Sequence, residues 1–188
     1  SAILHHREVT YSITCSLTDL KLPPGVKESY RTLCSFLVHF YSQLGLPVQF
    51  AKDASDRKTE EKSILCFNSH EPFDLVINGK KIGGNAQRRR RNLLFQHGSI
   101  PQEIDFELVK RTFVNSGGCE NALCLDTILG RQTDFYQLCT ILYESFRDIF
   151  GVKFIKHNLY EREINSFYHL VKDKYATSRW NKKEFAVK

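Results

Sequence analysis

The sequence predicts a mixed α/β domain whose sheet is mixed or largely antiparallel and is flanked by helices. Segments with strand patterns and segments with helix patterns both occur along the chain, and an Asn-Gly dipeptide joins two strand-like segments as in a tight hairpin. The chain has 188 residues and is 41% hydrophobic. That is enough for one domain with a real core and too short for two large domains. We expect a main domain over residues 1–155 and a helical extension over 156–188.

The first third of the chain predicts a strand, a helix and a short second strand. Residues 8–17 alternate and are rich in β-branched side chains, which is typical of a strand. Apolar residues recur at spacings of three and four over residues 26–44, so one amphipathic helix is expected there, ended by Gly45. Residues 48–50 favour a short strand, and the charged stretch 52–62 favours a loop.

The central part predicts a hairpin. Strands are expected at residues 64–67, 73–77 and 93–100. Asn78-Gly79 is a strong tight-turn signal that leads into a strand beginning near Lys81. Lys80 and Lys81 therefore lie just past the tip of the hairpin.

The last third predicts helices. Periodicity indicates helices at residues 106–113, 135–150 and 159–175. Asp134 can cap the second of these helices, and Gly151 follows its end.

Composition narrows the class of protein. The net charge is +6, which favours an anionic partner or ligand without identifying it. No apolar run approaches the roughly 20 residues that span a bilayer, and the first residues do not resemble an export signal. The six cysteines are scattered, so we expect free thiols, a cytoplasmic location and no structural metal.

The most informative stretch for chemistry surrounds Lys81. This lysine lies beside the turn and directly ahead of Gly83-Gly84-Asn85-Ala86, where small residues let a ligand approach the backbone. Backbone N–H groups can hold phosphate or carbonyl oxygens, and a lysine adds a mobile positive charge. The alternative is a solvated hairpin whose lysines are incidental.

The same stretch resembles the lipoate–protein ligase and octanoyltransferase family. The resemblance rests on Gly79–Gln87 followed by Gln96–Ile100, and it is specific. Supporting matches are Ala2–His5 with Glu8–Ser12, and Lys174–Thr177 with Trp180-Asn181. The chain begins inside the family's arginine- and glycine-rich segment, so we expect the first elements of the fold and part of the acyl pocket to be missing. It also has Asn85 where many members have serine.

The resemblance implies the fold shared with biotin ligases and an acyl chain held in an apolar tunnel. It implies that Lys81 contacts the acyl carbonyl and its leaving group. The substrate-binding residues that it implies are His5, Asp74, Gly83, Gly84, Asn85, Ala86, Gln87, His97 and Gly98. The acceptor would be a lysine on a hairpin tip of a lipoyl domain or of the glycine-cleavage carrier protein. Such acceptors are generally acidic, which suits a chain of net charge +6.

Two mechanisms within the family remain open. A ligase activates free lipoate with ATP and Mg²⁺, whereas a transferase takes octanoate from acyl carrier protein onto a cysteine. Leu65–Ser69 followed by Phe73–Leu75 resembles the cysteine-type octanoyltransferases, and Cys66 would be the nucleophile. This favours the thioester route slightly. The alternative is that Cys66 is a small buried hydrophobe at a strand end.

Other features allow functions outside this family. Arg88–Arg91 could contact phosphates of a nucleotide, of phosphopantetheine or of nucleic acid, although a solvated loop is favoured for at least two of the four. His97 could be catalytic or could make a structural hydrogen bond. A nucleic-acid-binding module is disfavoured because no RNP, KH or zinc-finger motif is present. A non-catalytic homologue that binds acyl groups or carrier proteins is a further alternative.

Overall fold

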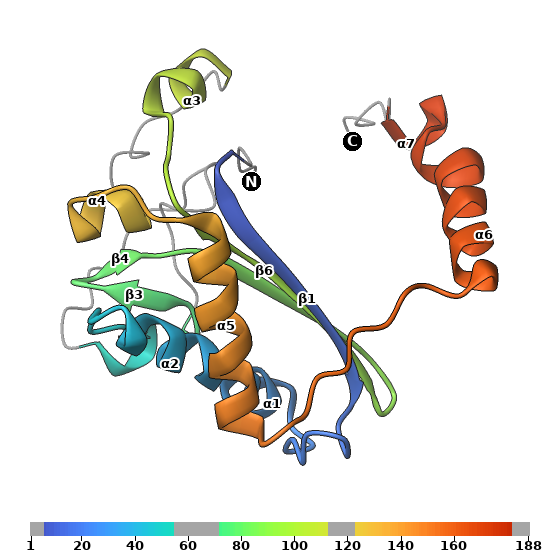
Figure 1. Ribbon diagram of the computed structural model, residues 1–188, viewed down its shortest axis with the longest axis horizontal. Coiled ribbons are helices and arrows are strands. Elements are labelled where there is room, and N and C mark those ends of the chain that lie inside the picture. Colours follow the sequence, from blue (N-terminus) through green and yellow to red (C-terminus); the bar gives the residue numbers. More distant parts are fainter. Residues whose placement is uncertain (1–5, 55–71, 113–122, 182–188) are drawn as a thin grey trace, which may run out of the picture. The chain divides into compact units, whose positions relative to one another are not determined.

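The computed structural model describes residues 6–54, 72–112 and 123–181 (Figure 1). The chain divides into two compact units, Ser1–Val152 and Lys153–Lys188. The first unit is an α+β domain with antiparallel sheets and flanking helices, so the predicted fold class is confirmed. The strand predicted at residues 64–67 lies outside the described residues.

The larger sheet of the first unit has three antiparallel strands in the order β1-β6-β5. β1 (Glu8–Ser16) pairs along its whole length with β6 (Leu93–Pro101). β5 (Gly84–Arg90) pairs with the other edge of β6. The strands predicted at 8–17 and 93–100 are thereby confirmed. In this register Gly98 lies between Tyr11 on β1 and Asn85 on β5.

The smaller sheet contains the predicted hairpin. Its strands β2 (Gln49–Phe50), β3 (Leu75–Ile77) and β4 (Lys80–Lys81) are antiparallel in that order. Asn78 and Gly79 have φ angles of 51° and 73°, as a two-residue hairpin turn requires. A short 3₁₀ turn, η1 (Ala51–Asp53), follows β2.

Two helices replace the single helix predicted over residues 26–44. α1 (Val26–Leu33) and α2 (Ser35–Gln43) are separated by Cys34, so that prediction was wrong in its continuity. The hydroxyl of Ser35 donates to the carbonyl of Thr32 at 2.7 Å. Such a side-chain bond competes with the helical ladder, which gives a physical reason for the break.

The helix predicted at 135–150 is confirmed as α5 (Phe135–Phe150). The carboxylate of Asp134 accepts from the N–H of Gln137 at 2.7 Å, and Gly151 has a φ of 62°, so both ends form as expected. The helix predicted at 106–113 is described as α3 (Phe106–Thr112), while the short helix α4 (Leu125–Leu129) was not predicted.

The core of the first unit lies between α1, α2 and α5 and one face of the β1-β6-β5 sheet. We call this face the inner face and the opposite one the outer face. Phe36 on α2 packs edge-on against Tyr11 of β1 and against Phe146 of α5, at 5.2 and 5.1 Å between ring centroids. The alternation of buried and exposed residues along β1 and β6 follows from this one-sided packing.

The second unit is helical and its described side chains are almost entirely exposed. α6 (Glu161–Leu170) runs into a π-helical turn (Val171–Tyr175), and α7 (Ser178–Asn181) follows. The helix predicted at 159–175 therefore starts two residues later and changes its winding over the last five residues. Among the helices in the described ranges, none is both long and apolar enough to cross a bilayer.

Candidate active site

Lys81 forms a buried ion pair with Asp74. The ammonium Nζ lies 2.7 Å from Oδ2 of Asp74, and the two side chains are 11% and 7% exposed. Lys81 is the cross-strand partner of Val76, and Asp74 lies two residues before Val76, so the pair shares a face of the small sheet. Val76 packs there with Ala51 and Ala54, apart from the main core. The pair is a charge-assisted hydrogen bond largely shielded from water.

The backbone that follows Lys81 is anchored from three directions. The N–H of Ile82 donates to the carbonyl of Leu75 at 3.1 Å, and the N–H of Leu123 donates to the carbonyl of Lys81 at 3.3 Å. The hydroxyl of Tyr41 donates to the carbonyl of Ile82 at 2.8 Å. The position of Lys81 is therefore fixed by its main chain as well as by its partner carboxylate.

The structural constraint at Gly83 differs from that at Gly84. Gly83 has a φ of +100°, and a Cβ atom there would lie 2.6 Å from the carbonyl oxygen of Ser99. The fold itself therefore requires glycine at position 83. A Cβ atom on Gly84 would meet no described atom within 4 Å, so the space beside its backbone is open. We call Ile82–Asn85 the glycine segment.

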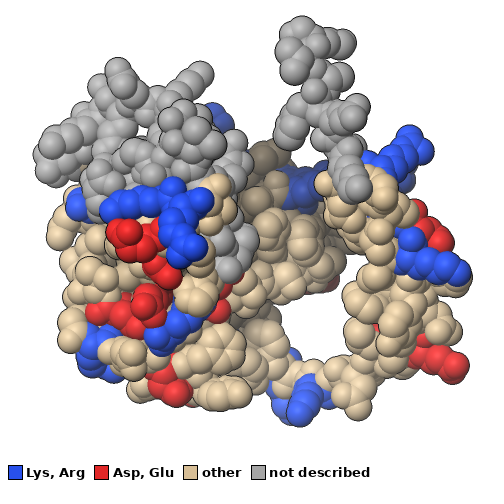
Figure 2. All heavy atoms as spheres, turned by 90° about the horizontal axis from the view of Figure 1, so that it is seen from above, with Lys and Arg blue, Asp and Glu red and all other residues tan. Residues whose placement is uncertain are grey.

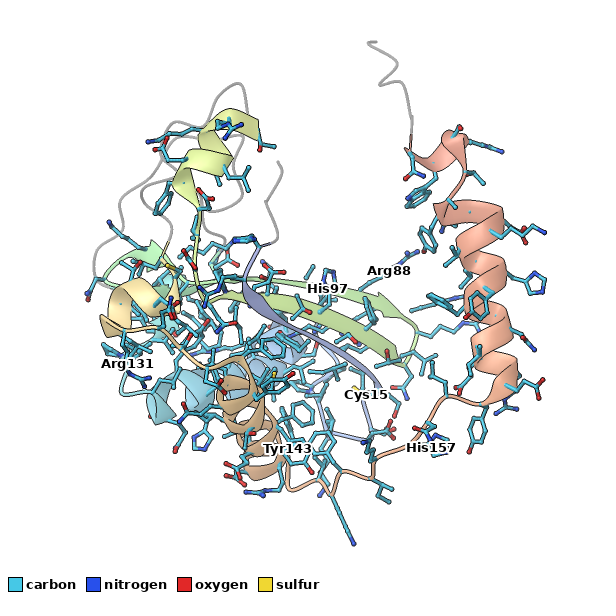
Figure 3. All side chains as sticks on the ribbon, turned by 45° about the horizontal axis from the view of Figure 1, so that its top comes forward. Cys15, Arg88, His97, Arg131, Tyr143 and His157 are labelled. Atoms are coloured by element: carbon cyan, nitrogen blue, oxygen red, sulfur yellow. The ribbon has the colours of Figure 1, made fainter. Side chains whose placement is uncertain are left out.

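The remaining motif residues divide between the two faces of the sheet. Ala86 and its cross-strand partner His97 are exposed on the outer face, where His97 stacks on Phe95 at 5.6 Å. Figure 3 shows His97 and Arg88 on the side away from α1 and α2. The imidazole of His97 makes no hydrogen bond within the described ranges, so a structural side-chain bond, one of its two predicted roles, is not seen there.

Asn85 turns its side chain toward the inner face. Its Oδ1 accepts a hydrogen bond from the hydroxyl of Tyr11 at 2.6 Å, across the two strands that flank Gly98. A Cβ atom on Gly98 would overlap both Oδ1 of Asn85 and the Tyr11 ring. Gly98 is therefore explained by a side-chain bond that passes over it, which the sequence did not reveal.

A chain of polar side chains continues from this bond into the core. Gln87 donates to Oε1 of Gln96 at 3.1 Å, and Nε2 of Gln96 faces the hydroxyl of Tyr11 at 3.1 Å and Sγ of Cys34 at 3.4 Å. Gln96 is completely buried. Its place among the core-facing residues of a predicted strand was the signal that could have identified it, because buried amides are retained only when bonded.

Burial keeps this network neutral. Burial raises the pKa of the Cys34 thiol to about 12 and raises the pKa of the Tyr11 phenol well above its usual range. Cys34 is therefore a protonated thiol at neutral pH, and it is not suited to act as a nucleophile.

The arginine run is part of a strand, which corrects the prediction of a loop. Arg88–Arg90 lie in β5 and Arg91 begins the turn to β6. Arg89 donates to the carbonyl of Pro24 at 2.8 Å and approaches the hydroxyl of Ser29 at 3.4 Å, so it has a structural role. Arg88 and Arg90 are exposed on the outer face.

A polar cavity of about 610 Å³ lies beside the start of β1. It is lined by His6, Arg7, Glu8, Thr10, Gln102, Thr133, Asp134 and Phe135. The carboxylate of Glu8 accepts from the hydroxyl of Ser99 at 2.7 Å, and Ser99 is the cross-strand partner of Gly84. One hydrogen bond thus links the cavity wall to the strand beside the glycine segment.

Basic and acidic side chains are interspersed on the face of the molecule that Figure 2 shows, so the positive charge is not gathered into one patch on that face.

His5 and Cys66 lie outside the described residues, so their predicted roles stay predictions. The described part of the chain stops at Ala54 and resumes at Pro72. Residues close to both of these points are held by main-chain hydrogen bonds near the Lys81–Asp74 pair. Ala51 donates its N–H to the carbonyl of Asp74 at 2.8 Å, and Lys52 donates to the carbonyl of Pro72 at 2.9 Å.

The fold is that of lipoate–protein ligases. A putative lipoate protein ligase from T. acidophilum with bound lipoic acid superimposes with a TM-score of 0.72 at 18% identity, over 93% of this chain and 64% of that one. A lipoate-protein ligase A bound with ATP gives the same TM-score, identity and coverage. The chain thus spans slightly less than two thirds of either solved protein.

The chain belongs to the lipoyl protein ligase A/B catalytic domain family, whose pattern matches residues 1–147. Octanoyltransferase LipM of Bacillus cereus is 29% identical over 97% of this chain and 70% of its own length. Octanoyltransferase LipM of Kyrpidia tusciae is 31% identical over 96% of this chain and 70% of its own length. The family predicted from the sequence is confirmed.

Proposed function

We propose that this protein is an enzyme that transfers an octanoyl group to a lysine of a lipoyl-domain protein. The observation that carries the proposal is the buried Lys81–Asp74 pair beside the open backbone of Gly84, in a chain that matches LipM octanoyltransferases over nearly its whole length. A fixed cation beside an accessible backbone stabilises negative charge on an acyl oxygen.

The proposed route passes through a thioester on Cys66. The Cys66 thiolate attacks the acyl carbonyl of the donor thioester, the bond from that carbonyl to the carrier sulfur breaks, and the carrier leaves as a thiolate that takes a proton from solvent. The acceptor lysine, as a neutral amine, then attacks the Cys66 thioester. The amide forms, the Cys66 sulfur leaves as a thiolate, and the amine nitrogen gives up a proton to solvent, so that Cys66 returns to its starting state. Lys81 supplies the positive charge that each tetrahedral oxyanion requires.

The proposed acceptor and the proposed donor of the acyl group are supported by different observations. An archaeal lipoate protein ligase studied together with its E2 lipoyl domain has the same fold at a TM-score of 0.70, which supports a lipoyl domain as acceptor. Octanoyl-acyl carrier protein as donor follows from the family resemblance alone. The glycine-cleavage carrier protein is the second acceptor to test.

An ATP-dependent ligase is the alternative within the family. A ligase would form an acyl-adenylate from free lipoate or octanoate with ATP and Mg²⁺. The likeness of the fold to an ATP-bound ligase keeps this route open. In that case Lys81 would contact the adenylate and Cys66 would carry no acyl group.

The mass of an acceptor lipoyl domain after incubation with the protein tests the proposal. One reaction contains octanoyl-acyl carrier protein alone, and the other contains lipoate, ATP and Mg²⁺. A gain of one octanoyl group in the first reaction only is the expected result. A gain in the second only identifies a ligase. No gain in either reaction contradicts an acyl-transfer function and favours the non-catalytic alternative.

A further inference from the structure

Three tyrosine hydroxyls from three different elements meet the glycine segment on the inner side of the domain. Tyr41 of α2 donates to the carbonyl of Ile82 at 2.8 Å, and Tyr11 of β1 donates to Oδ1 of Asn85 at 2.6 Å. Tyr30 of α1 lies farther away, 3.5 Å from the carbonyl of Asn85. No other side-chain hydroxyl within the described ranges bonds to these four residues.

Tyr41 binds the main chain between Lys81 and Gly83. It is 1% exposed, and Ile82, whose carbonyl it binds, is equally buried. Ile82 is the single residue between Lys81 and Gly83, where the chain passes from the small sheet toward the large one. A buried carbonyl without a donor is costly, so the hydroxyl defines the orientation of this peptide.

Gln96 determines the direction in which the Tyr11 hydroxyl donates its hydrogen bond. The phenol has one hydrogen, and the Nε2 group of Gln96 donates to its oxygen, so that hydrogen is directed to Asn85. Gln87 donates to Oε1 of Gln96 and so fixes which end of the Gln96 amide faces Tyr11. Burial raises the pKa of both Tyr11 and Tyr41, and both phenols stay donors at neutral pH.

We infer that Tyr41 and Tyr11 are positioning residues, which hold the glycine segment so that Lys81 and the open backbone at Gly84 keep a fixed relation to each other. This inference rests on the proposed function for its effect on catalysis. Both tyrosines act from the core side, Tyr41 through Ile82 and Tyr11 through Asn85.

Tyr41→Phe removes one hydroxyl and keeps the ring. We expect kcat for octanoyl transfer to fall about tenfold with KM changed less than twofold, because small displacements of a catalytic group lower the rate without weakening the binding of remote parts of the substrate. Tyr30→Phe is the matched control, since its 3.5 Å contact is marginal, and it should retain the parent kcat. Leu142→Ala, in the same core on α5, should lower the melting temperature without lowering kcat.

Hydrogen exchange tests the same inference without any activity. The amides of residues 82–85 should exchange faster in Tyr41→Phe than in the parent, whereas those of β1 should not. If the parent transfers no acyl group, the proposed function is wrong, and the exchange rates still decide whether Tyr41 holds the segment. Parent-like exchange in Tyr41→Phe, or activity losses in Tyr41→Phe and Leu142→Ala that follow melting temperature alone, would overturn the inference.

A double-mutant cycle tests whether Tyr11 acts through Asn85. Tyr11→Phe and Asn85→Ala should each lower kcat by about fivefold, the scale of one lost hydrogen bond. The double variant should be no slower than Asn85→Ala, because the two changes remove one interaction. Losses that multiply in the double variant would mean that Tyr11 acts elsewhere.

Discussion

The ammonium of Lys81 lies 2.7 Å from the carboxylate of Asp74, and both side chains are nearly buried. Lys81→Ala should lower octanoyl transfer by about 10²–10³, the usual effect of losing a group that stabilises an oxyanion. The measurement is the initial rate of acceptor modification by intact mass, with folding checked by circular dichroism.

Lys80→Ala is the control for that experiment. Lys80 is the neighbouring residue on β4, but its side chain is exposed and forms no ion pair with the described residues. It should keep near-parent activity. If Lys81→Ala is folded and retains more than a tenth of the parent rate, Lys81 is not the catalytic cation.

Asp74→Asn distinguishes what the ion pair contributes to folding stability from what Lys81 contributes to catalysis. Leaving one charge of a buried pair without its partner destabilises proteins by about 3–5 kcal/mol, so the urea midpoint should fall. The double variant Asp74→Asn with Lys81→Met has no charge left to bury and should recover much of the loss, yet it should be inactive. A double variant as unstable as Asp74→Asn would show that the ion pair is not what Asp74 contributes to folding.

The two glycines should respond differently to alanine. Gly83→Ala places a Cβ atom against the Ser99 carbonyl in a left-handed conformation, which should lower stability by about 1–3 kcal/mol. Gly84→Ala meets open space and should leave the melting temperature unchanged. Bulk at position 84 should instead weaken acyl-ligand binding, and Gly84→Val most of all. Parent-like ligand binding by Gly84→Val would place the acyl group elsewhere.

The parts of the fold that the sequence predicted well are those with local causes. Asn78-Gly79 specifies its hairpin through positive φ angles, and Asp134 specifies the start of α5 through its own side chain. The break at Cys34 was missed because the apolar spacing continues through it. At least two of the four arginines Arg88–Arg91 were predicted to lie in a loop, because their charge hides the alternation that places Arg89 inward.

In the candidate site, too, the features with local causes could be predicted and those that depend on distant contacts could not. Lys81 and the glycines could be predicted because a lysine, a tight turn and two small residues follow one another within a few positions of the chain. The roles of Tyr11, Tyr41 and Gln96 depend on contacts between residues 41 to 85 positions apart, which no local pattern contains. Gly98 was predicted to contact ligand, whereas a bond between two distant side chains already requires glycine there.

Thiol reactivity should distinguish the cysteines by burial. Because the pKa of Cys34 is raised to about 12, its thiolate is absent at pH 8 and appears only as the pH approaches that value. Iodoacetamide at pH 8 should therefore leave Cys34 unmodified in the folded protein, as peptide mass mapping would show. Cys34 alkylated in the native state as quickly as in urea would contradict its burial.

The Cys66 prediction decides the mechanism. If the route passes through a thioester, octanoyl-acyl carrier protein alone should raise the mass of the enzyme by one octanoyl group, and hydroxylamine should remove it. Cys66→Ser should lose the adduct and turnover together, while Cys34→Ser, the matched control, should keep the adduct because its thiol stays protonated. If the protein is a ligase, no adduct forms and turnover requires ATP and a free acid. Full activity of Cys66→Ser with ATP and lipoate would therefore reject the thioester and leave the family assignment intact.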